Sequence, residues 1–311
     1  MESWPVLGSI RPMDIDERDD TGAGAKADFV PSKGNRAAAL LAGFRQCSEL
    51  ARSMDWRGTL VVRNGELLVE QDGALFQAYD EPRFFRKTGR GIARPMRSRL
   101  KDRGIPIRTV FDVGANIGEV AIGFACHHPQ ARVFAFEPAP ENLRRLDANV
   151  ALQPERLGNL TIVREAMSDR RGEIDITVGA DSLNTVVLGD NLDRLRALAT
   201  FQIARVPTDS LDSCCTRFGV EEIDFLKVDI EGGEPLLSAA VRRLPGRIGS
   251  ALVEMSRFNS LDAYLELVDA FAAAGLAMED RHGEPVADPR GYIDGLLARQ
   301  TTINAWFLPQ R

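Results

Sequence analysis

The sequence predicts an α/β domain built on a doubly wound, mostly parallel β-sheet. Three observations support this fold class. From residue 109 onwards, short apolar stretches typical of buried strands alternate with amphipathic helical stretches. A glycine-rich turn follows the first of these strands. The first two strands end in acidic residues, Asp112 and Glu137, and ligands of such sheets bind at the carboxyl ends of the strands.

The composition and charge indicate a globular, cytoplasmic protein that does not bind nucleic acid. The chain has 311 residues, of which 44% are hydrophobic, and its net charge of −6 is not the basic footprint of a nucleic-acid-binding protein. Its N-terminus lacks the features of a signal peptide. The cysteine spacing fits neither a zinc site nor a disulfide framework, so we expect four reduced thiols: Cys47, Cys126, Cys214 and Cys215.

Three segments are expected along the chain. Residues 1–36 should form a flexible arm, because they show little apolar periodicity. Residues 37–105 should hold a helix, a hairpin turning at Asn64-Gly65 and a basic helical stretch. Residues 106–311 should form the main domain. We expect the helix and hairpin either to cover the substrate site or to make a subunit contact, as in a homodimer.

Nine basic residues lie between Arg83 and Arg103, against the single acid Asp102. One interpretation is a solvated helical face that is interrupted near Pro95. The other is a binding surface for an anionic partner, such as a phosphorylated sugar carrier or a membrane surface. The sequence leaves both interpretations open.

Strands and helices alternate through the main domain, which implies crossover connections between parallel strands. The expected strands are TVFDVG (109–114), ARVFAFEP (131–138), NLTIVREA (159–166), IDFLKVD (223–229), GSALVEMS (249–256) and TINAWFL (302–308). The expected helices are EVAIGFACHH (119–128), PENLRRLDANV (140–150), one from about Glu234, and LDAYLELVDAFAAAG (261–275).

The turn after the first strand favours S-adenosylmethionine over a dinucleotide. Gly114 and Gly118 allow the backbone to approach a ligand closely. Glu137 lies 23 residues beyond Gly114 (137 − 114), where its carboxylate could accept hydrogen bonds from ribose hydroxyls. The loop GANIG is not the GxGxxG that holds a pyrophosphate, and Asp112 would repel a phosphate. The ammonium and sulfonium of S-adenosylmethionine instead suit a carboxylate.

Five motifs follow one another between about Thr109 and Ala240: VFDVGANIGEVAI, FAFEPAPENLRRL, EAMSDRRGEIDI, VPTDSLDS and IDFLKVDIEGGE. In order and spacing they resemble the FkbM-type family of class I S-adenosylmethionine-dependent methyltransferases. The resemblance implies a seven-stranded, Rossmann-like methyltransferase sheet. It also implies O-methylation of a hydroxyl on a sugar, a glycoconjugate or a secondary metabolite.

The resemblance further implies a set of cofactor-binding residues. The methionine part would lie on the first strand end and the glycine-rich loop: Asp112, Gly114, Ala115, Asn116 and Gly118. Glu137 would bind the ribose, and the turn from Ala166 to Asp169, including Ser168, would bind the adenine. Asn142 is a further candidate ligand, although its side chain could instead face solvent.

The acceptor hydroxyl must lose its proton to a base or to a metal-bound group. Asp229, Glu231 and Glu254 lie near the ends of the later strands, where one could be the general base, or Asp229 and Glu254 could bind Mg²⁺. The alternative is that Asp229 contacts the cofactor, Glu231 caps a helix and Glu254 pairs with a basic residue. His282, in the turn RHGEP, is another candidate base, unless it is simply solvated.

Two other functions share parts of this pattern. An NAD-dependent dehydrogenase would share the sheet and Glu137, but the missing GxGxxG and the presence of Asp112 count against it. A non-catalytic protein that binds S-adenosylmethionine would share the whole fold. The intact glycine-rich loop favours an enzyme.

Overall fold

The computed structural model describes residues 42–43, 45–49, 58–63, 66–78, 92–178, 202–257, 259–299 and 302–310. The chain divides into two compact units, with the boundary between Arg94 and Pro95. The arm predicted for residues 1–36 lies outside the described residues. Among the described residues, no helix has both the length and the apolar character needed to cross a membrane.

The first unit contains a small antiparallel sheet of β1 (Thr59–Arg63), β2 (Glu66–Gln71) and β3 (Ala74–Gln77). Arg63 is the register partner of Glu66, so β1 and β2 form the predicted hairpin, although its turn residues lie outside the described ranges. The third strand was not predicted. Residues 42–43 and 45–49 are helical, within the segment where the sequence predicted a helix.

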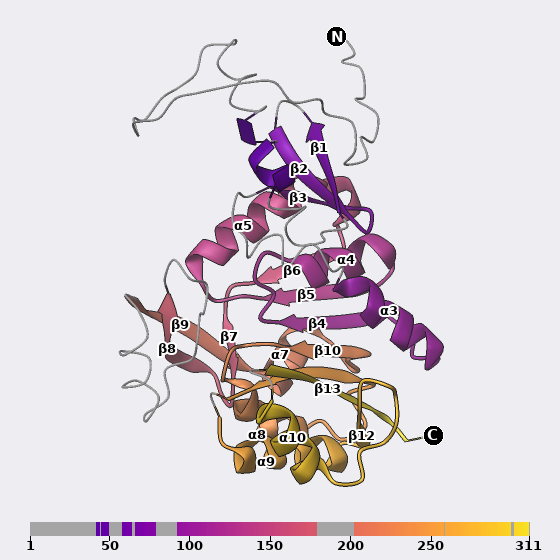
Figure 1. Ribbon diagram of the computed structural model, residues 1–311. Coiled ribbons are helices and arrows are strands. Elements are labelled where there is room, and N and C mark those ends of the chain that lie inside the picture. The colour runs from indigo at the N-terminus through magenta and orange to yellow at the C-terminus, as the bar shows by residue number, and fades with distance from the viewer. Residues whose placement is uncertain are drawn as a thin grey trace. The chain divides into compact units, whose positions relative to one another are not determined.

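The second unit is built on a seven-stranded sheet in the order β12-β13-β11-β10-β4-β5-β6 (Figure 1). Only β13 runs antiparallel to its neighbours within this sheet, so the predicted doubly wound, mostly parallel sheet is confirmed. The strands are β4 (Thr109–Val113), β5 (Arg132–Phe136), β6 (Leu160–Val163), β10 (Phe225–Val228), β11 (Ala251–Ser256), β12 (Leu276–Glu279) and β13 (Thr302–Pro309).

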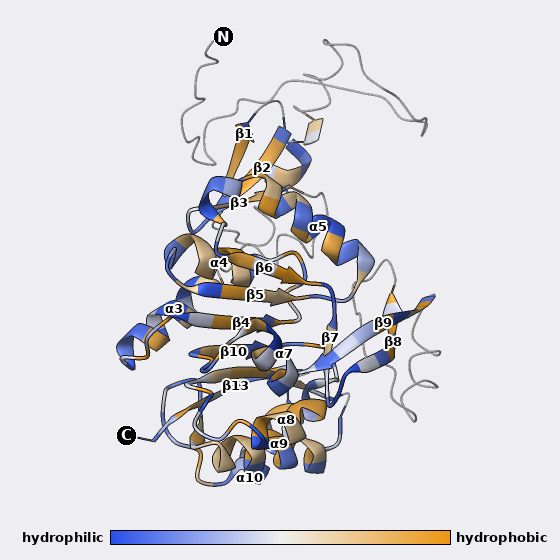
Figure 2. Ribbon diagram, turned by 180° about the vertical axis from the view of Figure 1, so that it is seen from behind, coloured by the Kyte–Doolittle hydropathy of each residue, from blue (hydrophilic) through white to orange (hydrophobic). Residues whose placement is uncertain are grey.

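Helices cover both faces of this sheet. They are α3 (Ala93–Asp102), α4 (Glu119–His127), α5 (Pro140–Ala151), α7 (Leu211–Phe218), α8 (Ser238–Arg242), α9 (Leu261–Ala273) and α10 (Pro289–Leu297), with the short 3₁₀ helices η1 (Pro154–Arg156) and η3 (Glu234–Leu237). On one face, Phe124 of α4 stacks on Phe225, which stacks on Trp306. In Figure 2 the strands β5 and β6 are mostly hydrophobic, whereas α5 carries both colours, as an amphipathic helix does.

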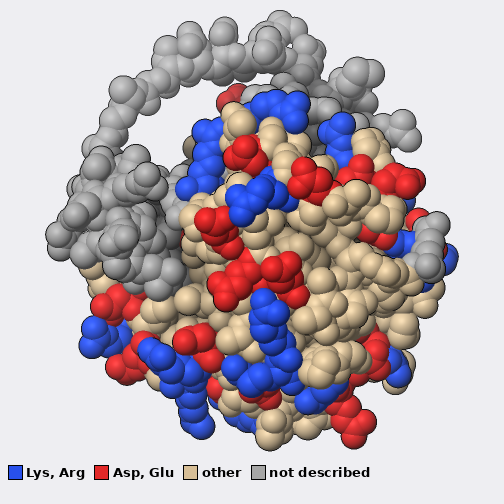
Figure 3. Space-filling view, turned by 90° about the horizontal axis from the view of Figure 1, so that it is seen from below, with Lys and Arg blue, Asp and Glu red and all other residues tan. Residues whose placement is uncertain are grey.

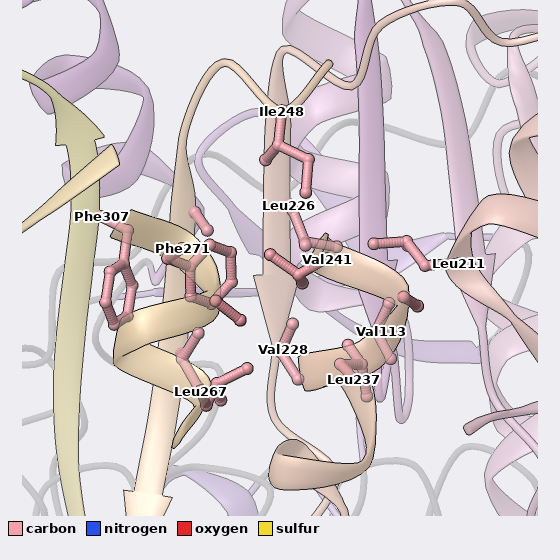
Figure 4. Close-up of a cluster of buried hydrophobic side chains, with 14 of the residues drawn as sticks. Val113, Leu211, Leu226, Val228, Leu237, Val241, Ile248, Leu267, Phe271 and Phe307 are labelled. Atoms are coloured by element: carbon pink, nitrogen blue, oxygen red, sulfur yellow. The ribbon is translucent and has the colours of Figure 1, made fainter. Parts of the chain in front are cut away.

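The main apolar core lies on the opposite face of the sheet (Figure 4). Val113 and Leu226 of the sheet meet Val241 of α8 and Phe271 of α9 there, and all four side chains are buried. Such burial stabilises the fold by about 1.5–3 kcal/mol for each large apolar side chain. The core therefore fixes the strand ends that carry the acidic residues.

A second three-stranded sheet stands beside the large one, at the left in Figure 1. Its order is β7-β9-β8, with β7 (Ala166–Ser168), β8 (Gly172–Val178) and β9 (Gln202–Ser210). Its side chains pack with Ala139, which follows β5, and with Leu236 of η3. The predicted turn at Ala166–Asp169 is thus wrong in its first three residues, which are extended because they pair with Thr208–Ser210 of β9.

One interpretation of the basic stretch was a helical face interrupted near Pro95. Residues 79–91 lie outside the described ranges, so this interruption stays a prediction. Pro95 lies in the first turn of α3, where a missing backbone N–H costs no intrahelical hydrogen bond. Arg99 and Arg103 of the described part form ion pairs with Glu279. Arg83 to Arg90 lie outside the described residues.

The face seen from below the view of Figure 1 carries both signs of charge (Figure 3). Acidic and basic side chains are interspersed there. A mixed surface of this kind produces no strong field of one sign. This face therefore offers no extended binding surface for a highly charged partner.

Candidate functional site

The glycine-rich loop between β4 and α4 needs glycine at two positions. Gly114 has φ 81°, and a Cβ there would lie 1.8 Å from the carbonyl oxygen of Asp229. Gly118 has φ 91°, and a Cβ there would lie 2.4 Å from Cδ1 of Leu146. The N–H groups of Gly114 and Ala115 both donate to the carbonyl oxygen of Phe136, at 3.0 and 2.9 Å. The loop is therefore held against the ends of both β5 and β10.

Glu137 ties this loop to the end of β5. One carboxylate oxygen accepts from the N–H of Asn116 at 2.8 Å, and the other accepts from the N–H of Ala139 at 2.9 Å and from Nδ2 of Asn142 at 3.2 Å. Burial raises the pKa of Glu137, and these hydrogen bonds oppose that rise. A carboxylate has about four lone-pair positions. These three hydrogen bonds use three of them, so one remains for a ligand hydroxyl.

Asn142 is buried rather than solvated. Its side chain is 6% exposed and donates to Glu137, so the alternative that it faces solvent is wrong. Ala166 and Ser168 are also buried, in β7, and the Ser168 hydroxyl bonds the side chain of Asp169 at 3.2 Å. The ligand roles of all three stay predictions.

Asp112 is fully buried beneath the loop. Its Oδ2 accepts from the N–H of Ala121 at 2.9 Å, and its Oδ1 lies 3.3 Å from Nζ of Lys227. Burial raises the pKa of Asp112, and the Lys227 ammonium opposes that rise. The charge expected to attract a cationic ligand is thus already paired with a cation, and the direct contact with a methionine part stays a prediction.

Lys227 is a site residue that the sequence reasoning missed. It lies in the middle of β10, is 7% exposed, and reaches Asp229 Oδ2 at 3.3 Å as well as Asp112. Burial lowers its pKa, but Asp229 and Asp112 outweigh burial and raise the pKa above the ordinary lysine value. The available signal was a lysine inside the apolar stretch IDFLKVD, because an unpaired lysine is almost never buried.

The three acids predicted at the later strand ends converge. One carboxylate oxygen from each of Asp229, Glu231 and Glu254 lies within 4.8 Å of the other two. Burial and then the neighbouring charge of Asp229 raise the pKa of Glu254 to about 9. Carboxyl groups this close titrate together, so the cluster holds a shared proton at neutral pH.

The oxygen geometry of this cluster suits a hard cation. Asp229 also faces the Lys227 ammonium at 3.3 Å, which already offsets part of the negative charge of the cluster. Another group of potential ligands among the described residues is Glu165, Asp209 and Cys214. The Arg217 guanidinium already contacts all three, and it lies 3.5 Å from Asp209. We therefore derive no step through a metal ion.

A second missed residue, Glu234, holds the loop that carries Asp229 and Glu231. Its carboxylate accepts from the N–H groups of Ile230 and Gly232, at 3.2 and 3.1 Å. The Tyr264 hydroxyl of α9 lies 3.4 Å from the same carboxylate, and it accepts from the N–H of Ser256 at 2.7 Å. The end of β11 and the loop after β10 therefore share one buried network.

We expect the Glu234→Gln variant to change how stability depends on pH. Burial raises the pKa of Glu234 from 4.5 to about 7. A raised folded-state pKa contributes stability that is full below the unfolded value and is lost as pH rises through the folded value. Between pH 5 and 8 the wild type should therefore lose stability relative to the variant, by up to about 1.4 kcal/mol per pH unit. Urea unfolding at several pH values measures this, and a constant difference would contradict it.

The described hydrogen bonds of His282 lie within its own turn and do not involve the acid cluster. Its N–H donates to Asp280 Oδ1 at 2.8 Å, and its Nε2 accepts from Nε of Arg281 at 3.0 Å. Arg99 of α3 donates to the carbonyl oxygen of Asp280 at 2.9 Å and holds the turn there. Among the described residues, the group of converging acids does not include His282. The structure thus brings together three of the four predicted catalytic residues.

The known proteins that this chain resembles are methyltransferases. Residues 112–243 match the model of the methyltransferase FkbM domain. The chain is 29% identical over 164 residues to the 2-O-methyltransferase NoeI of Sinorhizobium fredii (strain NBRC 101917 / NGR234), which covers 48% of this chain and 66% of NoeI. It is 26% identical over 148 residues to the methyltransferase sdnD of Sordaria araneosa, covering 40% of this chain and 57% of sdnD.

Among solved structures, the methyltransferase FkbM from Methylobacillus flagellatus KT matches with a TM-score of 0.39 and 17% identity, over 65% of this chain and 43% of that chain. The matched regions span at most about two thirds of these relatives' own lengths. The order of motifs and the family model agree over the same part of the chain. Residues 112–243, which include most of the candidate site, are therefore the part of the chain that matches the methyltransferase FkbM domain.

Proposed function

We propose that this protein is an S-adenosylmethionine-dependent O-methyltransferase. Its acceptor is a hydroxyl of a sugar, a glycoconjugate or a secondary metabolite. One observation carries the proposal: the glycine-rich loop tied to Glu137 packs, through Gly114, against the strand end that bears the acid cluster. A cofactor site and a proton acceptor thus share one edge of the sheet. The similarity to NoeI, a 2-O-methyltransferase, supports transfer to oxygen.

In such a reaction, different residues bind the cofactor and remove the proton of the acceptor. Bound S-adenosylmethionine supplies an electrophilic methyl group on a sulfonium. Glu137 keeps one lone-pair position for a ribose hydroxyl, and the loop at Gly114 allows close approach of the ligand. The acid cluster orients the acceptor hydroxyl and takes its proton. Glu254, whose pKa is raised to about 9, is a stronger base once ionised than an ordinary carboxylate.

Calorimetry with the full chain tests the cofactor. We expect S-adenosylhomocysteine to bind and NAD not to bind, because no described loop has the pyrophosphate-binding GxGxxG sequence and Asp112 lies beneath the loop that is present. Binding of NAD without a response to S-adenosylhomocysteine would instead favour a dehydrogenase. Binding of S-adenosylhomocysteine without methyl transfer to any of a panel of sugar and polyketide hydroxyls would favour a non-catalytic binding protein.

The Glu137→Ala variant should bind S-adenosylhomocysteine more weakly by about 1–3 kcal/mol. The substitution removes the acceptor of the Asn116 and Ala139 N–H groups and the proposed ribose contact. The matched control is Glu141→Ala, because Glu141 is an exposed acid on α5 that pairs with Arg145. Equal losses of affinity in the two variants, measured by calorimetry, would contradict the role of Glu137.

Chelation distinguishes the two groups that could remove the proton of the acceptor hydroxyl, a general base and a metal-bound group. We expect EDTA to leave methyl transfer unchanged, because Lys227 and the shared proton already reduce the negative charge of the cluster. Loss of transfer that Mg²⁺ restores would assign Asp229 and Glu254 to a metal site. The anionic partner of the basic stretch and the homodimer contact of the N-terminal segment stay predictions.

A further inference from the structure

Lys227 contacts both halves of the candidate site. Its Nζ donates to the carbonyl oxygen of Gly114 at 2.9 Å and lies 3.3 Å from both Asp112 and Asp229. We infer that Lys227 is a positioning residue that fixes the cofactor loop and the acid cluster to each other. This inference rests on the proposed function and assigns a role within that site.

The strand register explains how one lysine reaches three acceptors. β4 and β10 are parallel neighbours, and Lys227 is the register partner of Asp112, so both side chains leave the sheet on the same face. Gly114 lies two residues beyond Asp112, and Asp229 lies two residues beyond Lys227. An ammonium has three N–H donors, and here three acceptors surround it. The orientation of the ammonium is therefore fixed.

Lys227 makes more contacts than the neutralisation of Asp112 requires. A buried carboxylate such as Asp112 needs one nearby cation to offset its desolvation. The contact with Gly114 does something else, because it fixes the peptide group at the start of the cofactor loop. The contact with Asp229 acts on the other side of the site, since that side chain is 36% exposed and belongs to the acid cluster.

The test uses a variant that removes the two opposite charges together. Lys227→Met alone leaves Asp112 buried without a cation, which could unfold the domain. The double variant Asp112→Asn with Lys227→Met removes this imbalance and should keep a Tm close to that of the wild type. We expect its affinity for S-adenosylhomocysteine to fall at least about 10-fold, because Gly114 loses a charge-assisted hydrogen bond.

Arg108→Met is the matched control. Arg108 pairs with Asp224 at 2.7 Å and links β4 to β10 at their amino ends, away from the site. This variant should retain the wild-type affinity for S-adenosylhomocysteine. Asp112→Asn alone is the second control, because Asp112 is itself a candidate cofactor ligand and this variant keeps Lys227 and its hydrogen bond to Gly114.

The outcomes separate this inference from the proposed function. Affinity in the double variant equal to that of Asp112→Asn alone would overturn the inference and leave the cofactor assignment intact. Failure of the wild-type protein to bind S-adenosylhomocysteine would overturn both. Affinity lower in the double variant than in both Asp112→Asn and Arg108→Met would support the role of Lys227.

Discussion

Gly114→Ala is expected to destabilise the domain by more than about 3 kcal/mol, or to prevent it from folding. The new Cβ would lie 1.8 Å from the carbonyl oxygen of Asp229 and 2.8 Å from its carbonyl carbon. These are backbone atoms at the end of a central strand, so they cannot move aside as a flexible side chain could. The positive φ of 81° adds strain of its own. Urea unfolding measures the loss.

Gly219→Ala isolates the part of this effect that comes from φ. Gly219 ends α7 with φ 59°, and a Cβ there would meet no atom within 4 Å. Its replacement should cost about 1–2 kcal/mol, the usual penalty of a left-handed residue. If the two variants unfold at the same urea concentration, the close approach of the loop to β10 does not constrain residue 114.

Glu254→Gln should reduce turnover by about 10²- to 10⁴-fold, the range for loss of a positioned general base. The amide keeps the shape of the side chain but cannot take the proton of the acceptor. The affinity for S-adenosylhomocysteine should change little. Because the pKa of Glu254 is raised to about 9, the wild-type rate should increase with pH towards that value, and the variant should lose this increase.

His282→Ala is the corresponding control. His282 bonds within its own turn, so its loss should leave turnover nearly unchanged. Radiolabelled methyl transfer to an acceptor identified from the hydroxyl panel measures both variants. A large loss in His282→Ala with normal turnover in Glu254→Gln would transfer the role of base to the histidine.

Most of the large sheet could be predicted from the sequence, because its strands are continuous apolar stretches. The exception was β12, which has only four residues. The sheet of β7, β8 and β9 could not be predicted, because the partner of Ala166 is Thr208, far along the chain. Pairing over such a distance leaves no local pattern. Ala166, Met167 and Ser168, for which the family resemblance implied a turn, are therefore extended.

The candidate site, too, could be predicted only in part from the sequence. The sequence placed Asp229, Glu231 and Glu254 near strand ends, and the structure shows what the sequence could not, that their carboxylates converge. Lys227 was missed because its acceptor at Gly114 lies 113 residues away in the sequence. For His282 the sequence left a base and a solvated residue open, and the structure shows it exposed in a turn that Arg99 of α3 contacts.

The position of β13 has a consequence for how the sheet is completed during synthesis. β13 lies between β11 and β12 and pairs with both, yet it follows the other six strands of the large sheet in the sequence and is made after them. Until it emerges, β12 has no strand to pair with in this sheet and β11 presents an open edge, which is a template for association with other chains. Nascent chains stalled before Thr302 should therefore depend on chaperones far more than chains in which Thr302–Pro309 has emerged.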